Sequence, residues 1–224
     1  KLILNQTDFE IKKLNYKKNI NEKINIRIAG ILKSSKNLNF ESISILDKKN
    51  KIKINNLILD KDYLIYRFDK IDFDYIDTEK KDNQFIIQRQ NENHYKLNGL
   101  FLNANSIVTN LLEGKKEKEN KIFKNNFKLN LNLNEVYIDE INFVKNLQGL
   151  IFIKNNEIVD ANLSANFENN KNIIFSIETT DNDEKITKLY SSKAKPLVKR
   201  YKFIKGFDEG YLDFISTKKN DKSV

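Results

Sequence analysis

Apolar and polar residues alternate along most of this chain with a period of two. In the clearest run, from Phe127 to Leu133, phenylalanine and leucine occupy one face, and lysine and asparagine occupy the other. A second run, from Val159 to Phe167, places valine, alanine, leucine and phenylalanine on one face. Such alternation is typical of strands in an antiparallel sheet that is dry on one side only.

Shorter runs repeat the pattern and are separated by short polar breaks. The same alternation occurs at 24–28, 52–54, 95–97 and 173–177. The breaks that suit tight turns, in which Asn and Asp tolerate positive φ, lie at 47–50, 155–157 and 169–172. We therefore predict a mainly β fold, an extended and curled antiparallel meander.

Two segments break the strand pattern and favour short helices. In the first, 105–112, the residues that share one helix face are Ile107, Val108, Leu111 and Leu112, with Asn105 as the cap and Gly114 as the stop. The charge run that follows, 114–121, is predicted to be a loop. The second helix is predicted over 196–205, where Leu197, Val198, Tyr201 and Ile204 share a face and Pro196 suits the first turn.

Composition limits the size of the core. The chain has 224 residues, of which 39% are hydrophobic and 32% are charged. This balance predicts a thin core, built on one buried sheet face, in a folded chain. We treat residues 1–224 as a single β-rich region; a weak subdivision into 1–80 and 81–224 is the alternative, because polar residues lie at 78–83.

The net charge of +9 raises the question of a nucleic-acid partner. Of the 40 basic residues 36 are Lys, and they are scattered among Asn, Asp and Glu rather than gathered in a stripe. Nucleic-acid surfaces favour Arg, with its bidentate fork, and a clustered basic footprint. We therefore expect no nucleic-acid partner; a weak attraction to anionic lipid head groups is physically reasonable, and solubility is the simpler explanation.

Catalytic, metal and cofactor signatures are missing from the sequence. There is no Cys, and His94 is the single histidine, in a polar segment that we expect to be a surface turn. The densest carboxylate cluster is Asp69, Asp72, Asp74 and Asp77, and aromatic residues alternate with it, so a solvated polar face is the expected structure. No glycine-rich phosphate loop or nucleophile elbow is present. We expect no catalytic residue, no metal and no cofactor, and hence no enzyme.

The amphipathic sheet itself is the remaining candidate for function. A sheet with one apolar face must bury that face against another layer. The layer is either a second sheet, as in a closed sandwich, or the acyl chains of lipid, whose burial contributes about 0.8 kcal/mol per methylene. Both alternatives require the same alternation, so the pattern alone does not separate them.

The segment Thr187–Phe214 joins a strand, small residues, a short helix, a glycine and a second strand. This arrangement resembles the repeat end of AsmA-like envelope proteins of the YhdP type. The positions that carry the resemblance are Ala194, Leu197, Val198, Gly210 and Leu212, with Ser192 among the small residues. Upstream, 95–112 resembles the strand, glycine, strand and short helix of that family. The likeness covers about 95–215; it departs at Glu209, where many members have glycine, and at Asn103, often acidic in the family.

This resemblance implies a function in lipid handling without catalysis or a cofactor. Members are large proteins anchored in the bacterial inner membrane that project a curled β-groove across the periplasm and are implicated in moving phospholipid toward the outer membrane. On this basis the chain, which starts at Lys1, is expected to be a piece of a larger protein whose anchor lies elsewhere. The positions expected to face phospholipid acyl chains are Phe127, Leu129, Leu131, Leu133, Val159, Ala161, Leu163 and Phe167.

A second hypothesis is a structural or assembly domain of the cell envelope. In that case the apolar face belongs to a closed β-sandwich core, or is plugged by the two predicted helices, and its partners are envelope proteins rather than lipid.

Overall fold

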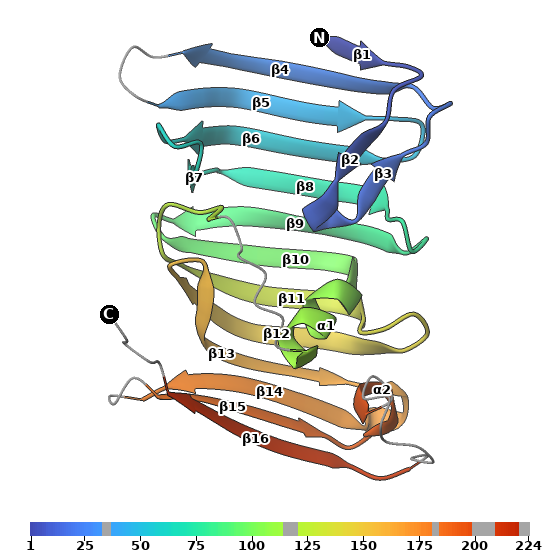
Figure 1. The fold of residues 1–224 in the computed structure, drawn as a ribbon, viewed down its shortest axis with the longest axis vertical. Coiled ribbons are helices and arrows are strands. Elements are labelled where there is room, and N and C mark those ends of the chain that lie inside the picture. The colour runs from blue at the N-terminus through green and yellow to red at the C-terminus, as the bar shows by residue number, and fades with distance from the viewer. Residues whose placement is uncertain (33–36, 114–120, 181–183, 199–208, 220–224) are drawn as a thin grey trace.

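The computed structural model describes residues 1–32, 37–113, 121–180, 184–198 and 209–219. Within these ranges fourteen strands form one large sheet (Figure 1). In spatial order its strands are β1 (Leu2–Leu4), β4 (Ile24–Leu32), β5 (Leu38–Leu46), β6 (Lys51–Leu59), β8 (Lys70–Ile76), β9 (Asp82–Asn91), β10 (His94–Asn103), β11 (Phe127–Tyr137), β12 (Phe143–Lys154), β13 (Glu157–Asn166), β14 (Asn172–Thr179), β15 (Glu184–Ser191) and β16 (Leu212–Lys219), with β7 (Ile65–Arg67) paired to β6 beside this path.

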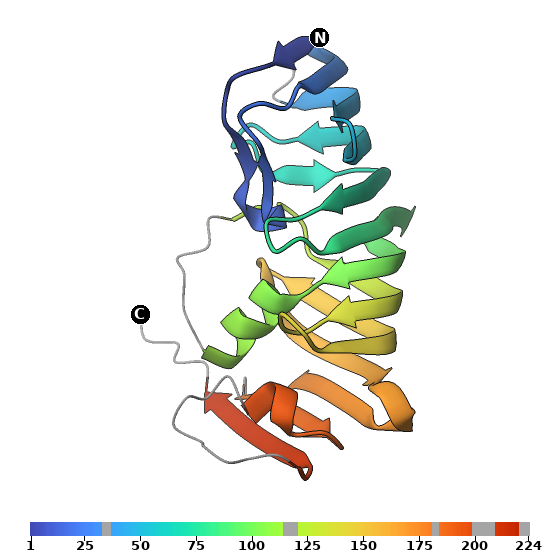
Figure 2. The ribbon, with the colours of Figure 1, turned by 90° about the vertical axis from the view of Figure 1, so that its right-hand side faces the viewer.

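Smaller elements lie on one side of this sheet, as the edge-on view shows (Figure 2). They are the hairpin β2 (Phe9–Ile11) and β3 (Tyr16–Lys18), joined by the short 3-10 turn η1 (Lys12–Leu14), and the helices α1 (Asn105–Glu113) and α2 (Lys195–Val198). A second 3-10 turn, η2 (Glu168–Asn170), connects β13 to β14.

The predicted fold class is confirmed: one curled, mostly antiparallel sheet with two short helices. Among the described strands β1 and β4 form one edge and β16 forms the other, and these edges do not pair, so the sheet is open and is not a closed sandwich. The sheet runs without a break across residue 80, because β8 pairs with β9 over its full length.

Both predicted helices exist at the predicted places. The first is one residue longer than expected, and Val108 packs against the core while Ile107 is 52% exposed, so the two do not share a buried face. The side chains of Leu111 and Leu112, and Gly114, lie outside the described residues. The second helix begins at Lys195; the remainder of the predicted span, with Tyr201 and Ile204, also lies outside them.

One strand pair departs from the predicted antiparallel meander. Strands β10 and β11 run parallel, in register from His94 opposite Lys128 to Asn103 opposite Tyr137. Parallel neighbours need a long crossover, because the chain must return to the end of the sheet where the first strand began. The segment from Ala104 to Asn126, which includes α1, is this crossover.

The hairpin turns follow the expected turn chemistry. Asp47 Oδ1 accepts the backbone N–H groups of Lys49 and Asn50, both at 2.8 Å, between β5 and β6. In the turn between β11 and β12, Asp139 accepts the N–H groups of Ile141 and Asn142 in the same way. The predicted turns at 155–157 and 169–172 contain Asn residues with positive φ, at 155, 156, 169 and 170. These turns are confirmed.

Candidate apolar binding face

A row of apolar residues crosses the sheet from one edge to the other. Each member is the Cα partner of the next on the neighbouring strand, so all lie on one face. We call this set the apolar row: Ile28, Ile43, Ile54, Ile71, Ile87, Leu97, Leu131, Gly149, Leu163, Phe175, Leu189 and Phe214.

The opposite face of the same strands is mostly polar. Along the register one residue removed from the apolar row, Arg27 is paired with Ser44, which is paired with Lys53 and then Asp72. Farther along, asparagine and glutamine occupy this register on β10, β11 and β12. The one-sided sheet predicted from the alternation is therefore present over most strands, and Ile86, Ile174 and Tyr190 are the exceptions in this register.

Burial along the apolar row is least at its two ends, and least of all at its N-terminal end. Leu97 is 6% exposed and Ile71 is 9% exposed, whereas Ile28 on β4 is 58% exposed. At the other edge, Phe214 on β16 is 41% exposed, although its neighbour Leu189 is buried. Apolar surface therefore reaches solvent at both edges of the sheet.

Gly149 interrupts the row of side chains on β12. Its φ is 148°, and a Cβ at this position would lie 2.0 Å from the backbone oxygen of Asn162. No other residue fits this close approach of β12 to β13 without a shift of the backbone. The result is a gap in the side-chain layer between Leu131 and Leu163.

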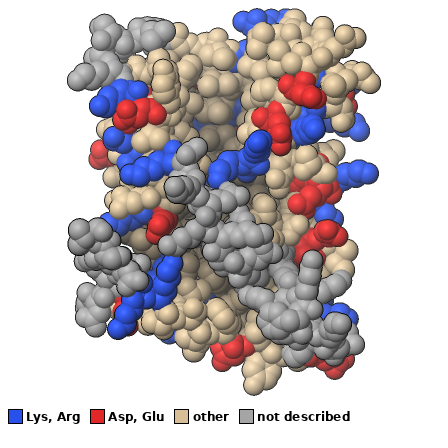
Figure 3. All heavy atoms as spheres, viewed as in Figure 1, with Lys and Arg blue, Asp and Glu red and all other residues tan. Residues whose placement is uncertain are grey.

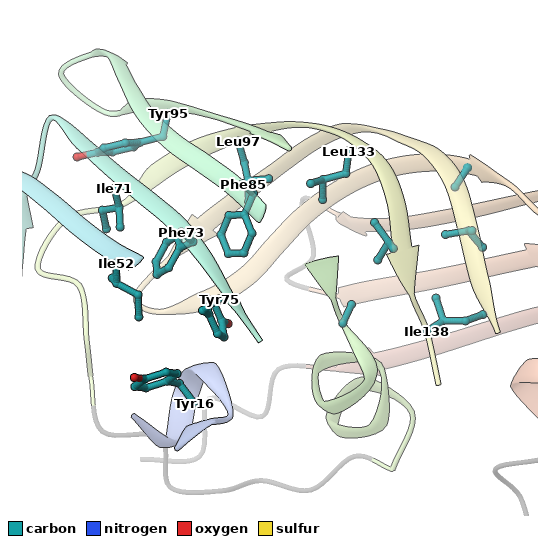
Figure 4. Close-up of a cluster of buried hydrophobic side chains, with 14 of the residues drawn as sticks. Tyr16, Ile52, Ile71, Phe73, Tyr75, Phe85, Tyr95, Leu97, Leu133 and Ile138 are labelled. Atoms are coloured by element: carbon teal, nitrogen blue, oxygen red, sulfur yellow. The ribbon is translucent and has the colours of Figure 1, made fainter. Parts of the chain in front are cut away.

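The β2–β3 hairpin covers one end of the N-terminal strands. Tyr16 packs edge-on against Tyr75, with ring centroids 6.0 Å apart, and its hydroxyl donates to Asp47 at 2.7 Å. The Tyr75 hydroxyl donates to the backbone oxygen of Leu14 at 3.0 Å. Burial raises the pKa of both tyrosines, so their hydroxyls are neutral donors. Figure 4 shows Tyr16 facing the aromatic side chains of β8 and β9.

A buried polar network holds the start of α1 against the turn between β8 and β9. Asp77 Oδ2 accepts from the side-chain amides of Asn83, at 3.1 Å, and Asn103, at 2.7 Å. Asn103 Oδ1 in turn accepts the backbone N–H of Asn105 at the helix start. A helix N-terminus is a favourable place for a negative charge. Asn103, which sequence analysis noted only as a departure from the family pattern, is thus a helix-capping residue.

The residues of the family-like motif meet at the C-terminal end of the same face. Ala194, Leu197 and Val198 are all buried, and the Ala194 N–H donates to the Gly210 oxygen at 3.0 Å. Gly210 itself is exposed, with φ of 113°, and Leu212 is partly buried opposite Ser191. These residues pack α2 against the sheet.

The eight positions predicted to face a ligand divide into two groups. Phe127, Leu133, Ala161 and Phe167 are buried by the chain itself. The partly buried positions are Leu129, Leu131, Val159 and Leu163. Leu131 and Leu163 belong to the apolar row, whereas Val159 lies in a register shift between β12 and β13 and has no Cα partner there.

Sequence reasoning missed the N-terminal part of this face. Ile28, Ile43 and Ile54 belong to the apolar row, and Ile28 is more exposed than any of its other members. The signal for Ile28 and Ile54 was the alternation at 24–28 and 52–54, which predicted strands but did not show that these strands extend the same face. In the space-filling view this upper part of the face is hollowed, with tan walls and charged side chains along its flanks (Figure 3).

The carboxylate cluster at 69–77 takes structural roles. Asp69 binds Arg89, with Oδ1 2.7 Å from Nη2, and hydrogen bonds from Asn56 and Arg89 outweigh burial and hold the pKa of Asp69 below its usual value. Asp72 pairs with Lys51 at 3.4 Å, and Asp74 is exposed. In the part of the chain that the structure describes, no group of three or more His, Cys, Asp or Glu is arranged to hold a metal ion.

The polar turn predicted before a strand is present at 92–93, between β9 and β10, but His94 itself lies just after the turn. It is the first residue of β10 and is partly buried, and its Nε2 atom has no hydrogen-bond partner among the described residues.

These features define a class of protein: a mainly β chain built on one open sheet whose single apolar face is only partly covered by its own hairpin and helices. Comparison of the chain with protein-family models, with curated proteins and with solved structures found no match. Within the described ranges, no helix has the length and hydrophobicity needed to cross a bilayer.

Proposed function

We propose that this chain is a non-enzymatic segment of a periplasmic AsmA-like protein, anchored to the inner membrane, whose apolar face shields or conducts phospholipid acyl chains toward the outer membrane. The observation that carries the proposal is the apolar row, which continues across the open sheet and is exposed at both edges. Burial of a methylene contributes about 0.8 kcal/mol, so an acyl chain lying along the row replaces the missing second layer.

The N-terminal strands offer the most accessible place for such a chain. Ile43 and Ile54 are partly buried, Ile28 is exposed, and the face is hollowed there (Figure 3). The opposite face of these strands carries Arg27 and Lys53, which are exposed, and Ser44, which is partly buried. An acyl chain therefore has one preferred side of the sheet.

The test is native mass spectrometry and lipid extraction of the purified chain, followed by photo-crosslinking to an acyl-chain probe. We expect co-purified phospholipid and crosslinks to β4, β5 and β6. The double variant Ile43→Asp with Ile45→Asp is expected to bind at least tenfold less phospholipid, because two carboxylates would face the acyl chain. Leu131→Asp and Leu163→Asp test the two members of the apolar row that the sequence predicted to face acyl chains.

The matched control is Ser42→Asp with Ser44→Asp. It adds the same charge to the same strand, but on the polar face, so lipid content should be unchanged. Circular dichroism of each variant separates loss of binding from loss of the fold. Purified chain without lipid and without probe labelling on β4–β6 would contradict the proposal.

A second candidate is a structural or assembly domain of the cell envelope. The observation that favours it is the cover that the chain supplies to its own apolar face, from the β2–β3 hairpin, α1 and α2 (Figure 2). In that case the remaining exposed apolar surface binds envelope proteins, and the lipid experiment returns a lipid-free chain.

A further inference from the structure

The net positive charge of the chain is concentrated in its N-terminal strands. Residues 1–66 hold 14 Lys and Arg against seven Asp and Glu, whereas residues 67–224 hold 26 against 24. Seven of the nine net charges therefore belong to residues 1–66, a segment that ends within β7. Charge asymmetry of this size along a chain favours an anionic partner for the charged end.

Large apolar side chains are exposed at the same end. Leu2 and Ile3 on β1 are 52% and 41% exposed, and Ile20, in the loop after β3, is 52% exposed. The Lys18 ammonium donates to the backbone oxygens of Asn5 and Ile20, so this loop is held beside the end of β1. Together with Ile28 on β4, these exposed apolar side chains are distributed along the N-terminal edge of the sheet.

Cationic side chains are interspersed with this edge. Lys1 precedes β1, Lys23 immediately precedes β4, and Arg27 adjoins Ile28, and all three are exposed. Apolar side chains that enter the head-group region, accompanied by Lys and Arg, are the ordinary means by which a protein surface binds an anionic bilayer.

We propose that the N-terminal edge of the sheet, formed by Leu2, Ile3, Ile20 and Ile28 with Lys1, Lys23 and Arg27, docks on an anionic lipid surface. This interaction goes beyond the shielding of acyl chains, because all of its side chains except Ile28 lie outside the apolar row, and it holds even if the apolar row binds no lipid. Beyond Ile26, the outer side of β4 has no partner strand among the described residues. Its backbone groups need water, so the edge lies at head-group depth and not in the hydrocarbon.

The charge also argues against a second copy of the chain as the partner of this edge. Two N-terminal edges brought together would place like charges opposite one another, which is unfavourable. An anionic surface does not repel this edge. It attracts each cationic side chain, with about a fivefold gain in binding for each Lys or Arg near the surface.

The test is flotation of the full chain with vesicles of phosphatidylcholine alone and of phosphatidylcholine with phosphatidylglycerol in equal parts. We expect binding to the anionic vesicles only, and its loss at high salt, because salt screens the attraction. The variant Lys23→Glu with Arg27→Glu should weaken this binding about 25-fold or more. The control Lys188→Glu with Lys218→Glu makes the same change of charge on β15 and β16 and should leave binding within about twofold.

The apolar contribution is tested by Leu2→Ser with Ile20→Ser, which should weaken vesicle binding, against Ile141→Ser with Ile215→Ser, which should not. Equal losses of vesicle binding in the Lys23 and Arg27 variant and in the Lys188 and Lys218 control would overturn the proposal, since net charge alone would then explain the binding. Concentration-dependent dimerisation without vesicle binding would also overturn it and assign the edge to a second copy. Phospholipid extracted from the Lys23 and Arg27 variant reports separately on the apolar row, so the two proposals fail independently.

Discussion

Lys18 is the residue whose environment is least expected from its type. It is 1% exposed, and its ammonium group donates to the backbone oxygens of Asn5, Thr7, Asn19 and Ile20 at 3.2, 2.9, 2.9 and 3.3 Å. A buried ammonium is tolerated only when its donors are satisfied. Lys18 therefore holds together two loops that have few other hydrogen bonds to each other among the described residues.

Replacement of this side chain tests its role. Lys18→Met retains the aliphatic stem but leaves the carbonyl groups without their donor, and we expect the free energy of unfolding to fall by about 2 kcal/mol. Urea denaturation measures the change. Lys17→Met, at the adjacent exposed position, should alter stability by less than about 0.5 kcal/mol. Equal effects of the two substitutions would show that the carbonyl cage does not stabilise the fold.

Asp47 links turn chemistry to the dependence of stability on pH. Although partial burial opposes its ionisation, hydrogen bonds from the side chain of Asn50, the N–H of Lys49 and the Tyr16 hydroxyl hold the pKa of Asp47 below its usual value. The folded-state pKa is thus lower than the unfolded value of about 4. The stabilisation is present above that pH, and it is lost as the pH falls from there through the folded-state pKa.

Substitution of Asp47 should therefore change the acid limb of the stability profile. Asp47→Asn is expected to lower the free energy of unfolding at neutral pH by about 1 kcal/mol and to flatten its decline below about pH 4. Denaturant titrations across this range measure both effects. Asp74→Asn, on an exposed position of the polar face, should leave the profile as it is; a decline that is equally steep in the Asp47 variant would contradict the assignment.

At the scale of elements, α1 depends on the buried polar network at its start. Asn103 is shared between the helix cap and Asp77, so Asn103→Ala removes a cap and also one partner of a buried carboxylate. We expect a loss of about 2 kcal/mol in stability. Hydrogen exchange should show that protection falls first in residues 105–109 of α1.

The control is Asn98→Ala on the same strand, whose register places it on the opposite, polar face. It should leave exchange in α1 unchanged. Uniform loss of protection across the sheet in the Asn103 variant would mean that the network supports the whole fold and not the helix alone.

A strand could be predicted from the sequence where apolar and polar residues alternate within that strand. The runs at 127–133 and 159–167 are strands β11 and β13, and the Asp and Asn turns lie where the polar breaks placed them. The β2–β3 hairpin was not predicted, because β2 and β3 have three residues each and so show too little periodicity. The parallel pairing of β10 with β11 was also missed, since two strands of the same pattern can pair in either direction.

At the scale of the whole molecule, the same apolar face is a core in one place and a solvent-exposed surface in another. Leu133 is completely buried among neighbouring strands, whereas Ile28 at the sheet edge is 58% exposed. These two residues carry similar side chains on the same face of the sheet. At Leu133 the side chain is part of the packed core, whereas at Ile28 the apolar surface remains in solvent.

Truncation of these two side chains measures the difference. Leu133→Ala is expected to lower the free energy of unfolding by about 2–5 kcal/mol, because it leaves a cavity in a packed site. Ile28→Ala should change stability by less than about 0.5 kcal/mol while it reduces binding of the acyl-chain probe. Comparable destabilisation by both substitutions, in urea denaturation, would mean that the edge of the row belongs to the core.

The sequence by itself determined the local structure of this protein: period-two strands, Asp and Asn turns, two short helices and a sheet with one apolar face. These features depend on residues that are close together in the chain, and alternation, turn chemistry and helix caps act at that range. The tertiary structure decided which part of the face is covered. Tyr16 reaches Tyr75, and Asn103 reaches Asp77, across 59 and 26 positions of sequence. Such contacts depend on the path of the whole chain, so only the folded molecule shows that the apolar row remains exposed at Ile28 and Phe214.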